Sequence, residues 1–190
     1  MNRALFLWIS ALSIALSGCV PVLIAGAVGG TAMVATDRRS AGAQVDDESI
    51  ELKIATQAAS EFGERIHLNA TSYNGIVLLT GEVPDQAALA SVGNLAKNTE
   101  KVRGVHNEMV VGPNSDFSAR SNDTYITSKV KTRMLEANKF PPNVVKVVTE
   151  RSAVYLMGIV SKEEGDAAAE IAATTAGVAR VVKFFQYPKT

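Results

Sequence analysis

Apolar and polar positions follow the same order twice along the chain. Each copy opens with a stretch, residues 46–60 or 123–137, in which isoleucine or valine recurs after four residues, a spacing typical of an amphipathic helix. Asp46 or Asp47 in the first copy and Asp123 in the second stand at the start of these stretches. A carboxylate there can accept hydrogen bonds from the free amides of a first helical turn, so we predict acidic N-caps. Metal binding by the acidic cluster is the alternative.

A β-hairpin is predicted next in each copy. Asn74-Gly75 separates the two strand-like runs of the first copy, and both residues tolerate the positive φ of a tight turn. Arg151-Ser152 holds the same place in the second copy and is a poorer turn pair, which predicts a looser or longer hairpin. The four runs span residues 66–70, 76–79, 144–148 and 154–157.

A second helix and a final strand complete each copy. Ser161 and Glu164 have the spacing of a capping box, and Pro84 suits a first helical position. The final strands are predicted at residues 107–111 and 181–187. Each copy is therefore an αββαβ unit of α+β class, with two helices covering one face of a three-stranded mixed sheet.

The beginning of the chain predicts export. Arg3 precedes an apolar run over residues 4–15 that is too short to span a bilayer of about 30 Å, so it indicates a signal peptide. The closing Leu16-Ser17-Gly18-Cys19 resembles the bacterial lipobox. That resemblance implies cleavage before Cys19, a diacylglycerol on its sulfur and an acyl chain on the new amino terminus. An ordinary secretory signal is the alternative, and because Cys19 is the only cysteine an internal disulfide is excluded.

These patterns divide the chain into five parts. A Gly/Ala-rich segment follows Cys19; its proline and glycines and its short apolar run indicate a tether, not a membrane span. A stretch rich in proline, asparagine and serine separates the two copies and indicates a linker. The predicted parts are a signal peptide at 1–18, a lipidated tether at 19–45, a first domain at 46–112, a linker at 113–121 and a second domain at 122–190.

Charge distinguishes the two copies. Residues 19–121 contain 8 basic and 12 acidic residues, a net charge of −4, whereas residues 122–190 contain 10 basic and 7 acidic residues, a net charge of +3. An anionic partner is therefore expected to prefer the second copy.

The helical stretch 123–137 supports that expectation. At about 100° per residue its core side is formed by Ile126, Val130 and Met134, and Leu135 falls on the opposite side. Apolar tips bordered by ammonium groups suit the interface of an anionic membrane. The phospholipid-binding residues predicted on this basis are Tyr125, Ser128, Lys129, Lys131, Thr132 and Leu135. The matching positions of the first copy carry small or polar residues instead: Ser49, Ala55, Thr56 and Ala59. Packing of Tyr125 and Leu135 against the linker or the first domain is the alternative.

The two copies resemble the BON domain of bacterial envelope proteins. The resemblance rests on the Asp-led first helices, on a Gly-Val pair before each last strand, and on the segments Leu79-Thr80-Gly81-Glu82-Val83 and Leu156-Met157-Gly158-Ile159-Val160. Resemblance to lipoproteins with two such domains implies an anchor on the periplasmic face of the outer membrane, phospholipid binding by the second domain, and a role in outer-membrane integrity at division sites. The resemblance also implies a tryptophan where this chain has Tyr125, a smaller group that would insert less deeply.

Catalysis finds little support in the sequence. The two histidines, His67 and His106, lie in strand-like segments of the first copy, and no nucleophile motif, phosphate-binding glycine loop or metal-ligand spacing is present. We therefore predict a non-enzymatic protein with no cofactor beyond its acyl chains, no metal, no small-molecule substrate and no nucleic-acid partner. The alternative function is that of an adaptor for envelope proteins, in which lipid is only the anchor, since an exposed apolar patch suits either partner.

Overall fold

The computed structural model describes residues 37–188, and the side chain of residue 142 is left undescribed. Cys19, the predicted signal peptide and most of the predicted tether therefore lie outside the described residues. The first copy consists of α2 (Ala41–Phe62), η1 (Gly63–Arg65), β1 (His67–Tyr73), β2 (Ile76–Val83), α3 (Gln86–Asn98), β3 (Gly104–Asn107) and β4 (Val110–Val111). The second consists of α4 (Phe117–Ala137), η2 (Pro142–Val144), β5 (Val145–Glu150), β6 (Ala153–Ile159), α5 (Lys162–Ala173) and β7 (Arg180–Gln186).

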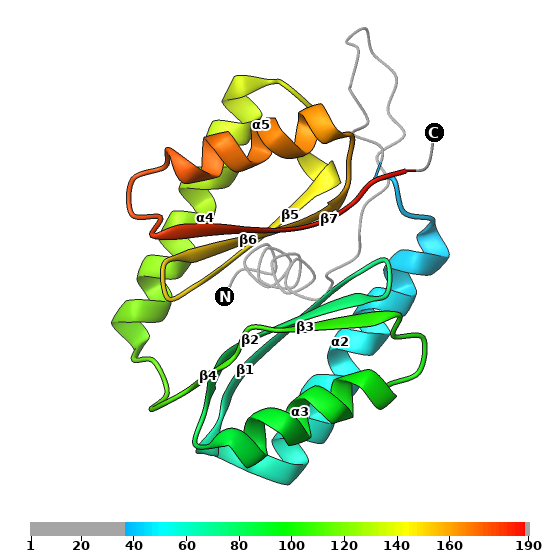
Figure 1. Ribbon diagram of the computed structural model, residues 1–190, viewed down its shortest axis with the longest axis vertical. Coiled ribbons are helices and arrows are strands. Elements are labelled where there is room, and N and C mark those ends of the chain that lie inside the picture. Colours follow the sequence, from blue (N-terminus) through cyan, green and yellow to red (C-terminus); the bar gives the residue numbers. More distant parts are fainter. Residues whose placement is uncertain (1–36, 189–190) are drawn as a thin grey trace, which may run out of the picture. The chain divides into compact units, whose positions relative to one another are not determined.

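Each copy forms a mixed sheet with two helices on one face (Figure 1). β1 and β2 pair antiparallel, and α3 returns the chain so that β3 runs parallel to β2. β5, β6 and β7 repeat this arrangement around α5. The predicted α+β class and αββαβ order are confirmed; the short β4, which also pairs with β2, is formed by the last two residues of the final strand predicted at 107–111.

The helices bury their predicted apolar sides against the sheets. Ile50 and Ile54 of α2 are at most 1 % exposed, and Ile126 and Val130 of α4 are fully buried. The opposite faces of the two sheets contribute a further cluster that contains Tyr73 and Leu78 of the first copy together with Tyr155 and Met157 of the second. Both faces of β2 and β6 are therefore covered, which is why their sequences read as continuous apolar runs.

Both first helices begin earlier than predicted. Ser40 caps α2 by accepting from the Ala43 amide, and Asp116 caps α4 by accepting from the Ala119 amide. Each helix therefore starts within the segment predicted as tether or linker, at Ala41 and Phe117. In the second helices the predicted capping box of Ser161 is confirmed, whereas the cap of α3 is Asp85 and not a turn started by Pro84.

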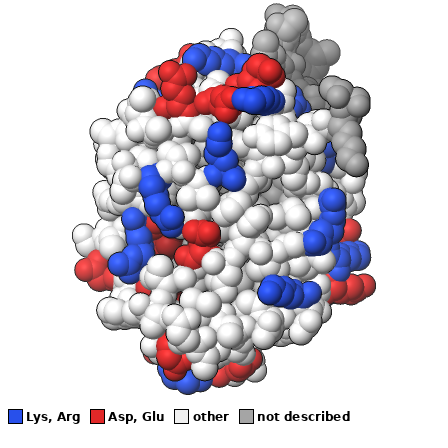
Figure 2. All heavy atoms as spheres, in the orientation of Figure 1, with Lys and Arg blue, Asp and Glu red and all other residues white. Residues whose placement is uncertain are grey.

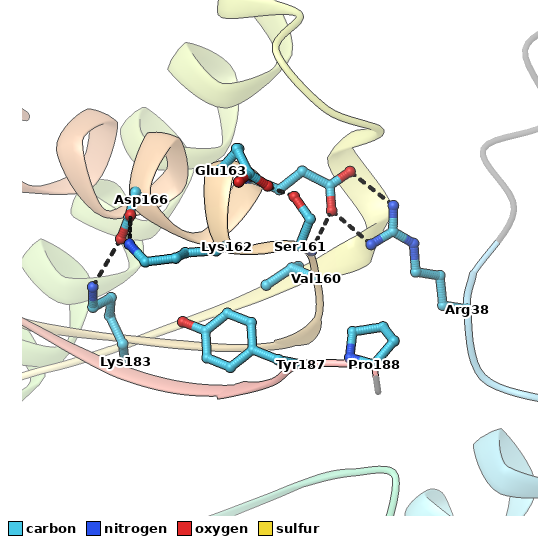
Figure 3. A pocket seen from close by; sticks show the side chains of 10 residues that line it. Arg38, Val160, Ser161, Lys162, Glu163, Asp166, Lys183, Tyr187 and Pro188 are labelled. Carbon is cyan, nitrogen blue, oxygen red and sulfur yellow. Dashed lines mark hydrogen bonds and ion pairs between the residues drawn. The ribbon is translucent and has the colours of Figure 1, made fainter. Parts of the chain in front are cut away.

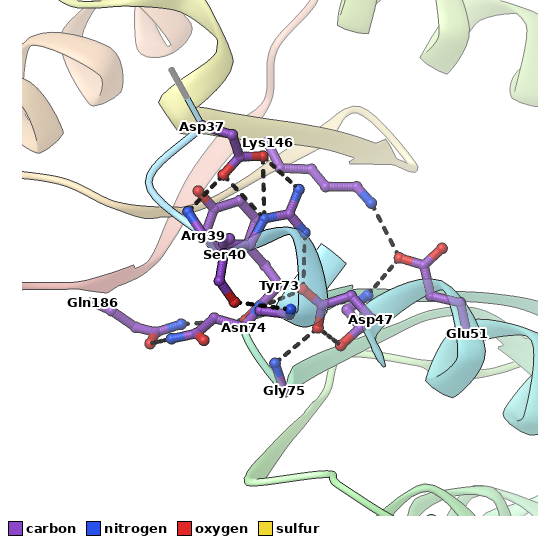
Figure 4. Close-up of polar contacts among 12 residues, drawn as sticks. Asp37, Arg39, Ser40, Asp47, Glu51, Tyr73, Asn74, Gly75, Lys146 and Gln186 are labelled. Carbon is purple, nitrogen blue, oxygen red and sulfur yellow. Dashed lines mark hydrogen bonds and ion pairs between the residues drawn. The ribbon is translucent and has the colours of Figure 1, made fainter. Parts of the chain in front are cut away.

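The aspartates predicted as N-caps lie inside the helices and hold the hairpin turns. Asp47 is 2 % exposed and accepts from the amides of Asn74 and Gly75, at 2.7 and 2.8 Å (Figure 4). Asp123 is 5 % exposed and accepts from the Arg151 and Ser152 amides, in the turn of the second hairpin, at 2.8 Å each. The acidic-cap prediction was wrong because a carboxylate can serve turn amides distant in sequence as well as those of its own helix.

The second hairpin is as tight as the first. Arg151 and Ser152 both have positive φ, 51° and 60°, as Asn74 and Gly75 do in the first turn. The expected looser or longer hairpin is not observed, since the bonds from Asp123 offset the conformational cost at two residues that lack glycine's freedom.

The final strand of the first copy is shifted and interrupted. β3 begins at Gly104, three residues before the predicted strand, and ends at Asn107. The Asn107 side chain then accepts from the Met109 amide and donates to the Leu89 carbonyl. These local bonds lie between β3 and β4, where the pairing of this segment with β2 is interrupted. In the second copy β7 ends at Gln186, one residue before the prediction.

Candidate functional site

Helix α4 carries two large apolar side chains on its surface. Tyr125 is 62 % exposed and Leu135 is 61 % exposed, although Ile126 and Met134, their immediate neighbours in the chain, are buried. The helical period turns adjacent residues by about 100°, so one side of α4 packs on the sheet while the other presents these tips to solvent. Both side chains are therefore exposed and are not buried against the linker or the first domain.

Two grooves flank this exposed side. One, of about 510 Å³, is lined by Tyr125, Ser128, Lys129 and Thr132 on α4 and by the chain after α5. The other, of about 610 Å³, is lined by Lys131, Thr132 and Leu135 together with Arg39, Tyr73 and Lys146. All six residues predicted from the sequence thus border one groove or the other, and Thr132 borders both.

The cations of α4 differ in how far they are already engaged. The Lys129 ammonium lies 4.5 Å from the centre of the Tyr125 ring and donates to the Ala176 carbonyl. Arg133 donates to the Ile171 carbonyl at 2.9 Å and to the Thr175 hydroxyl at 2.7 Å. Lys131, by contrast, is exposed and has no ion pair or hydrogen bond among the described residues. Lys131 is therefore the cation beside Leu135 that can meet a phosphate without first losing a bond.

The first copy shows what sequence comparison missed. Its matching positions, such as Ser49 and Ala55, are exposed as expected. However, Leu52 and Val45 of α2 are 68 % and 65 % exposed, so the first copy also has exposed apolar side chains on its first helix. The helices differ more in charge: α2 has one basic and five acidic residues, net −4, whereas α4 has four basic and two acidic, net +2.

Charge is otherwise mixed over the surface. On the face shown in Figure 2, basic and acidic side chains are interspersed and most of the area is uncharged. A cavity of about 730 Å³ lies at the start of α5 (Figure 3). Arg38 makes two bonds to Glu164 there, at 2.6 and 2.7 Å. Asp166 there pairs with Lys162 and Lys183. The bond to Arg38 holds the pKa of Glu164 below its ordinary value. These charges neutralise one another, so this cavity does not single out an anionic ligand.

The two histidines lie in different environments. His106 stacks on Phe184 with 3.9 Å between ring centroids, and burial lowers the pKa of its imidazole. His67 lies opposite Glu82 in the β1–β2 ladder, and its Nδ1 is 2.9 Å from a Glu82 oxygen. Glu150, from the second copy, lies close to both. No local sequence pattern predicts this cluster, because its members are distant along the chain and only the fold brings them together.

Comparisons with known proteins agree with the fold. Residues 46–113 and 122–189 each match the BON domain. The chain is 39 % identical over 177 residues to the outer membrane lipoprotein DolP of Haemophilus influenzae, covering 92 % of this chain and 91 % of that protein. It is 38 % identical to a 21 kDa hemolysin of Actinobacillus pleuropneumoniae, with coverage of 80 % and 79 %. It is 28 % identical to the osmotically-inducible protein Y of Escherichia coli, with coverage of 72 % and 70 %.

The described residues contain no helix that is both long and apolar enough to cross a membrane. Two BON domains in tandem, and a relative that matches over nearly the whole length of both chains, establish the relationship. The chain therefore belongs to the BON-domain family, as a two-domain outer-membrane lipoprotein of the DolP type.

Proposed function

We propose that the protein binds anionic phospholipid through the exposed side of α4 in its second domain, and that this binding helps to maintain the outer membrane at division sites. The observation that carries the proposal is the exposure of Tyr125 and Leu135 on a helix of net charge +2, with the unpaired Lys131 between them in sequence. The proposed role is one of binding, not catalysis.

The size of the surface sets the expected affinity. Full burial of one large apolar side chain stabilises by about 1.5–3 kcal/mol, so two side chains exposed by three fifths contribute about 2–4 kcal/mol together. Lys131 adds about 1 kcal/mol near an anionic surface. The total, about 3–5 kcal/mol, corresponds to a dissociation constant near the millimolar range. Binding this weak becomes effective when a lipid anchor holds the domain beside the bilayer, because tethering raises its effective concentration.

The anchor itself is the second element of the proposal. Cys19 would carry the diacylglycerol and the N-terminal acyl chain implied by the lipobox-like segment. Single acyl chains bind membranes only marginally, whereas several chains give stable anchoring. The intact mass of the chain extracted from membranes should show the loss of residues 1–18 and the added acyl groups, and Cys19→Ser should abolish both.

Flotation tests the lipid contact apart from the anchor. At lipid concentrations on the order of 10 mM, above the millimolar dissociation constant, residues 20–190, which lack the acylated cysteine, should float with phosphatidylglycerol-containing vesicles and not with pure phosphatidylcholine vesicles. High salt should weaken the flotation, because it screens the ammonium–phosphate attraction over about 10 Å or less. Equal flotation with both vesicle types, or none with either, would refute the proposal.

One observation favours the second candidate, an adaptor for envelope proteins. Leu52 and Val45 of α2 form an exposed apolar pair on a helix of net charge −4, which an anionic membrane would repel. Such a surface suits a protein partner with a basic rim. A photo-crosslinking residue at position 52 in cells should trap one defined envelope protein if this candidate holds, and no product if it does not.

A further inference from the structure

Three potential metal ligands meet where the two domains face each other. His67 is on β1 and Glu82 on β2, and the register of the two strands sets them directly opposite. Glu150 ends β5 of the second domain. Their ligand atoms all lie within 4.8 Å of one another: His67 Nδ1 is 2.9 Å from Glu82 Oε2 and 3.9 Å from Glu150 Oε1.

Both carboxylates are buried without matching positive charge. Glu82 is 0 % and Glu150 4 % exposed. The Arg151 guanidinium reaches a Glu82 oxygen at 3.4 Å, but that side chain is 54 % exposed. Glu150 accepts from the Asn69 amide through one oxygen, and its other oxygen receives no hydrogen bond among the described residues. Two buried carboxylates facing one half-exposed arginine favour a further cation.

A buried hydroxyl gives a second and independent indication. Thr80 is 0 % exposed and its Oγ1 has no hydrogen-bond partner in the described part of the chain. It lies two residues before Glu82 on β2 and opposite Asn69, so its side chain projects on the same face as those of Glu82 and His67. A buried unpaired hydroxyl on the same face of the sheet as the cluster points to a polar occupant.

We propose that His67 Nδ1, Glu82 and Glu150 bind one divalent transition-metal cation of the Zn²⁺ class, and that the cation ties the first domain to the second. One imidazole and two carboxylates suit Zn²⁺, which binds such atoms at about 2.0–2.2 Å. Tetrahedral ligands at that distance lie about 3.4 Å apart. His67 and Glu82, now 2.9 Å apart, therefore have to separate slightly, and Glu150 has to move closer.

The rest of the site follows from the ligand chemistry. The cation takes the place of the proton on His67 Nδ1, and the imidazole stays neutral with its proton on Nε2. The fourth position holds water, which gives the Thr80 hydroxyl a partner. The Ser115 amide, 3.2 Å from Glu82 Oε2, orients that carboxylate, and the Ser115 hydroxyl lies 3.4 Å from His67 Nδ1.

The test uses the full chain in detergent, made without a histidine tag and stripped with EDTA. Zn²⁺ is titrated in competition with a chromophoric chelator, and Co²⁺ binding is followed by visible absorption. We expect one equivalent of Zn²⁺, displacement of Co²⁺ by Zn²⁺, and a higher thermal midpoint with Zn²⁺. His67→Gln and Glu150→Gln should each weaken binding at least about tenfold. His106→Gln removes the other histidine and should bind like the natural chain.

Each result bears on the proposal. It is overturned if the natural chain binds no stoichiometric Zn²⁺, since His67 then acts only as an ionic bridge between two glutamates. It is also overturned if His67→Gln binds Zn²⁺ as tightly as the natural chain, or if His106→Gln is the variant that loses binding. If circular dichroism shows that Glu150→Gln does not fold, the proposal is judged from the Zn²⁺ affinity of His67→Gln and from the Co²⁺ spectrum of the natural chain.

Discussion

Replacing Asp123 by asparagine tests the turn-holding carboxylate, the feature that both domains share. Asp123 accepts from the Arg151 and Ser152 amides at 2.8 Å each and is 5 % exposed. Asparagine keeps one acceptor but turns an NH₂ group toward the other amide, so one bond is lost and one buried donor is left unpaired. A hydrogen bond to a charged group is worth about 1.5–3 kcal/mol, and an unsatisfied buried donor costs about 1–3 kcal/mol.

We therefore expect Asp123→Asn to lower the free energy of unfolding by about 2.5–6 kcal/mol, out of a total of about 5–15 kcal/mol for a typical protein. Urea unfolding measured by circular dichroism gives this difference. Asp116→Asn is the matched control: it makes the same change on the same helix at the exposed N-cap, where asparagine and aspartate are nearly equivalent. A loss below about 0.5 kcal/mol in Asp123→Asn, or an equal loss in both variants, would refute the reasoning.

Three further predictions follow from the same geometry. Ser152→Gly should raise the free energy of unfolding by about 1–2 kcal/mol in urea, because this position has positive φ; an unchanged midpoint would show that the turn is not strained. Gly81→Ala should destabilise by more than about 3 kcal/mol, since its φ is +116° and a Cβ would lie 2.0 Å from the His67 carbonyl oxygen; Gly63→Ala, with nothing within 4 Å of the new Cβ, should cost less, and the reverse order would contradict the packing. Burial pushes the pKa of Asp47 up, but bonds from Ser72, the Gly75 amide, Arg39 and the Asn74 amide outweigh it and the pKa lies below its ordinary value. A carboxylate with a depressed pKa stabilises the folded state fully above its unfolded-state pKa of about 3.9, and this contribution is lost as the pH falls through the lower folded-state pKa. The loss of stability below about pH 4 should therefore be shallower in Asp47→Asn.

Much of the fold could be predicted from the sequence because it is written twice. The spacing of Ile126 and Val130 identified the buried side of α4, and the matching Ile50 and Ile54 did the same for α2. The errors fall where one residue type has two uses. Asp47 and Asp123 were predicted as N-caps, whereas the residues that cap α2 and α4 stand several residues earlier, at Ser40 and Asp116.

The candidate site divides in the same way. The helical period was enough to place Tyr125 and Leu135 on the surface, because it depends only on local geometry. The comparison of matched positions did not point to the exposed Leu52 of α2, because its counterpart in α4 is the polar Ser128. The cluster of His67, Glu82 and Glu150 depends on strand register and on contact between domains, which no local pattern records.

The most direct measurement compares two equally exposed leucines. Leu135→Glu and Leu52→Glu are made in residues 20–190, and binding to phosphatidylglycerol-containing vesicles is measured for each. Leu135→Glu loses about 1–2 kcal/mol of burial and adds repulsion of about 1 kcal/mol, which predicts binding weaker by a factor of about 30–150. Leu52→Glu should bind as the unchanged chain does. Equal binding by both variants, or a loss confined to Leu52→Glu, would contradict the proposal that α4 of the second domain meets the membrane.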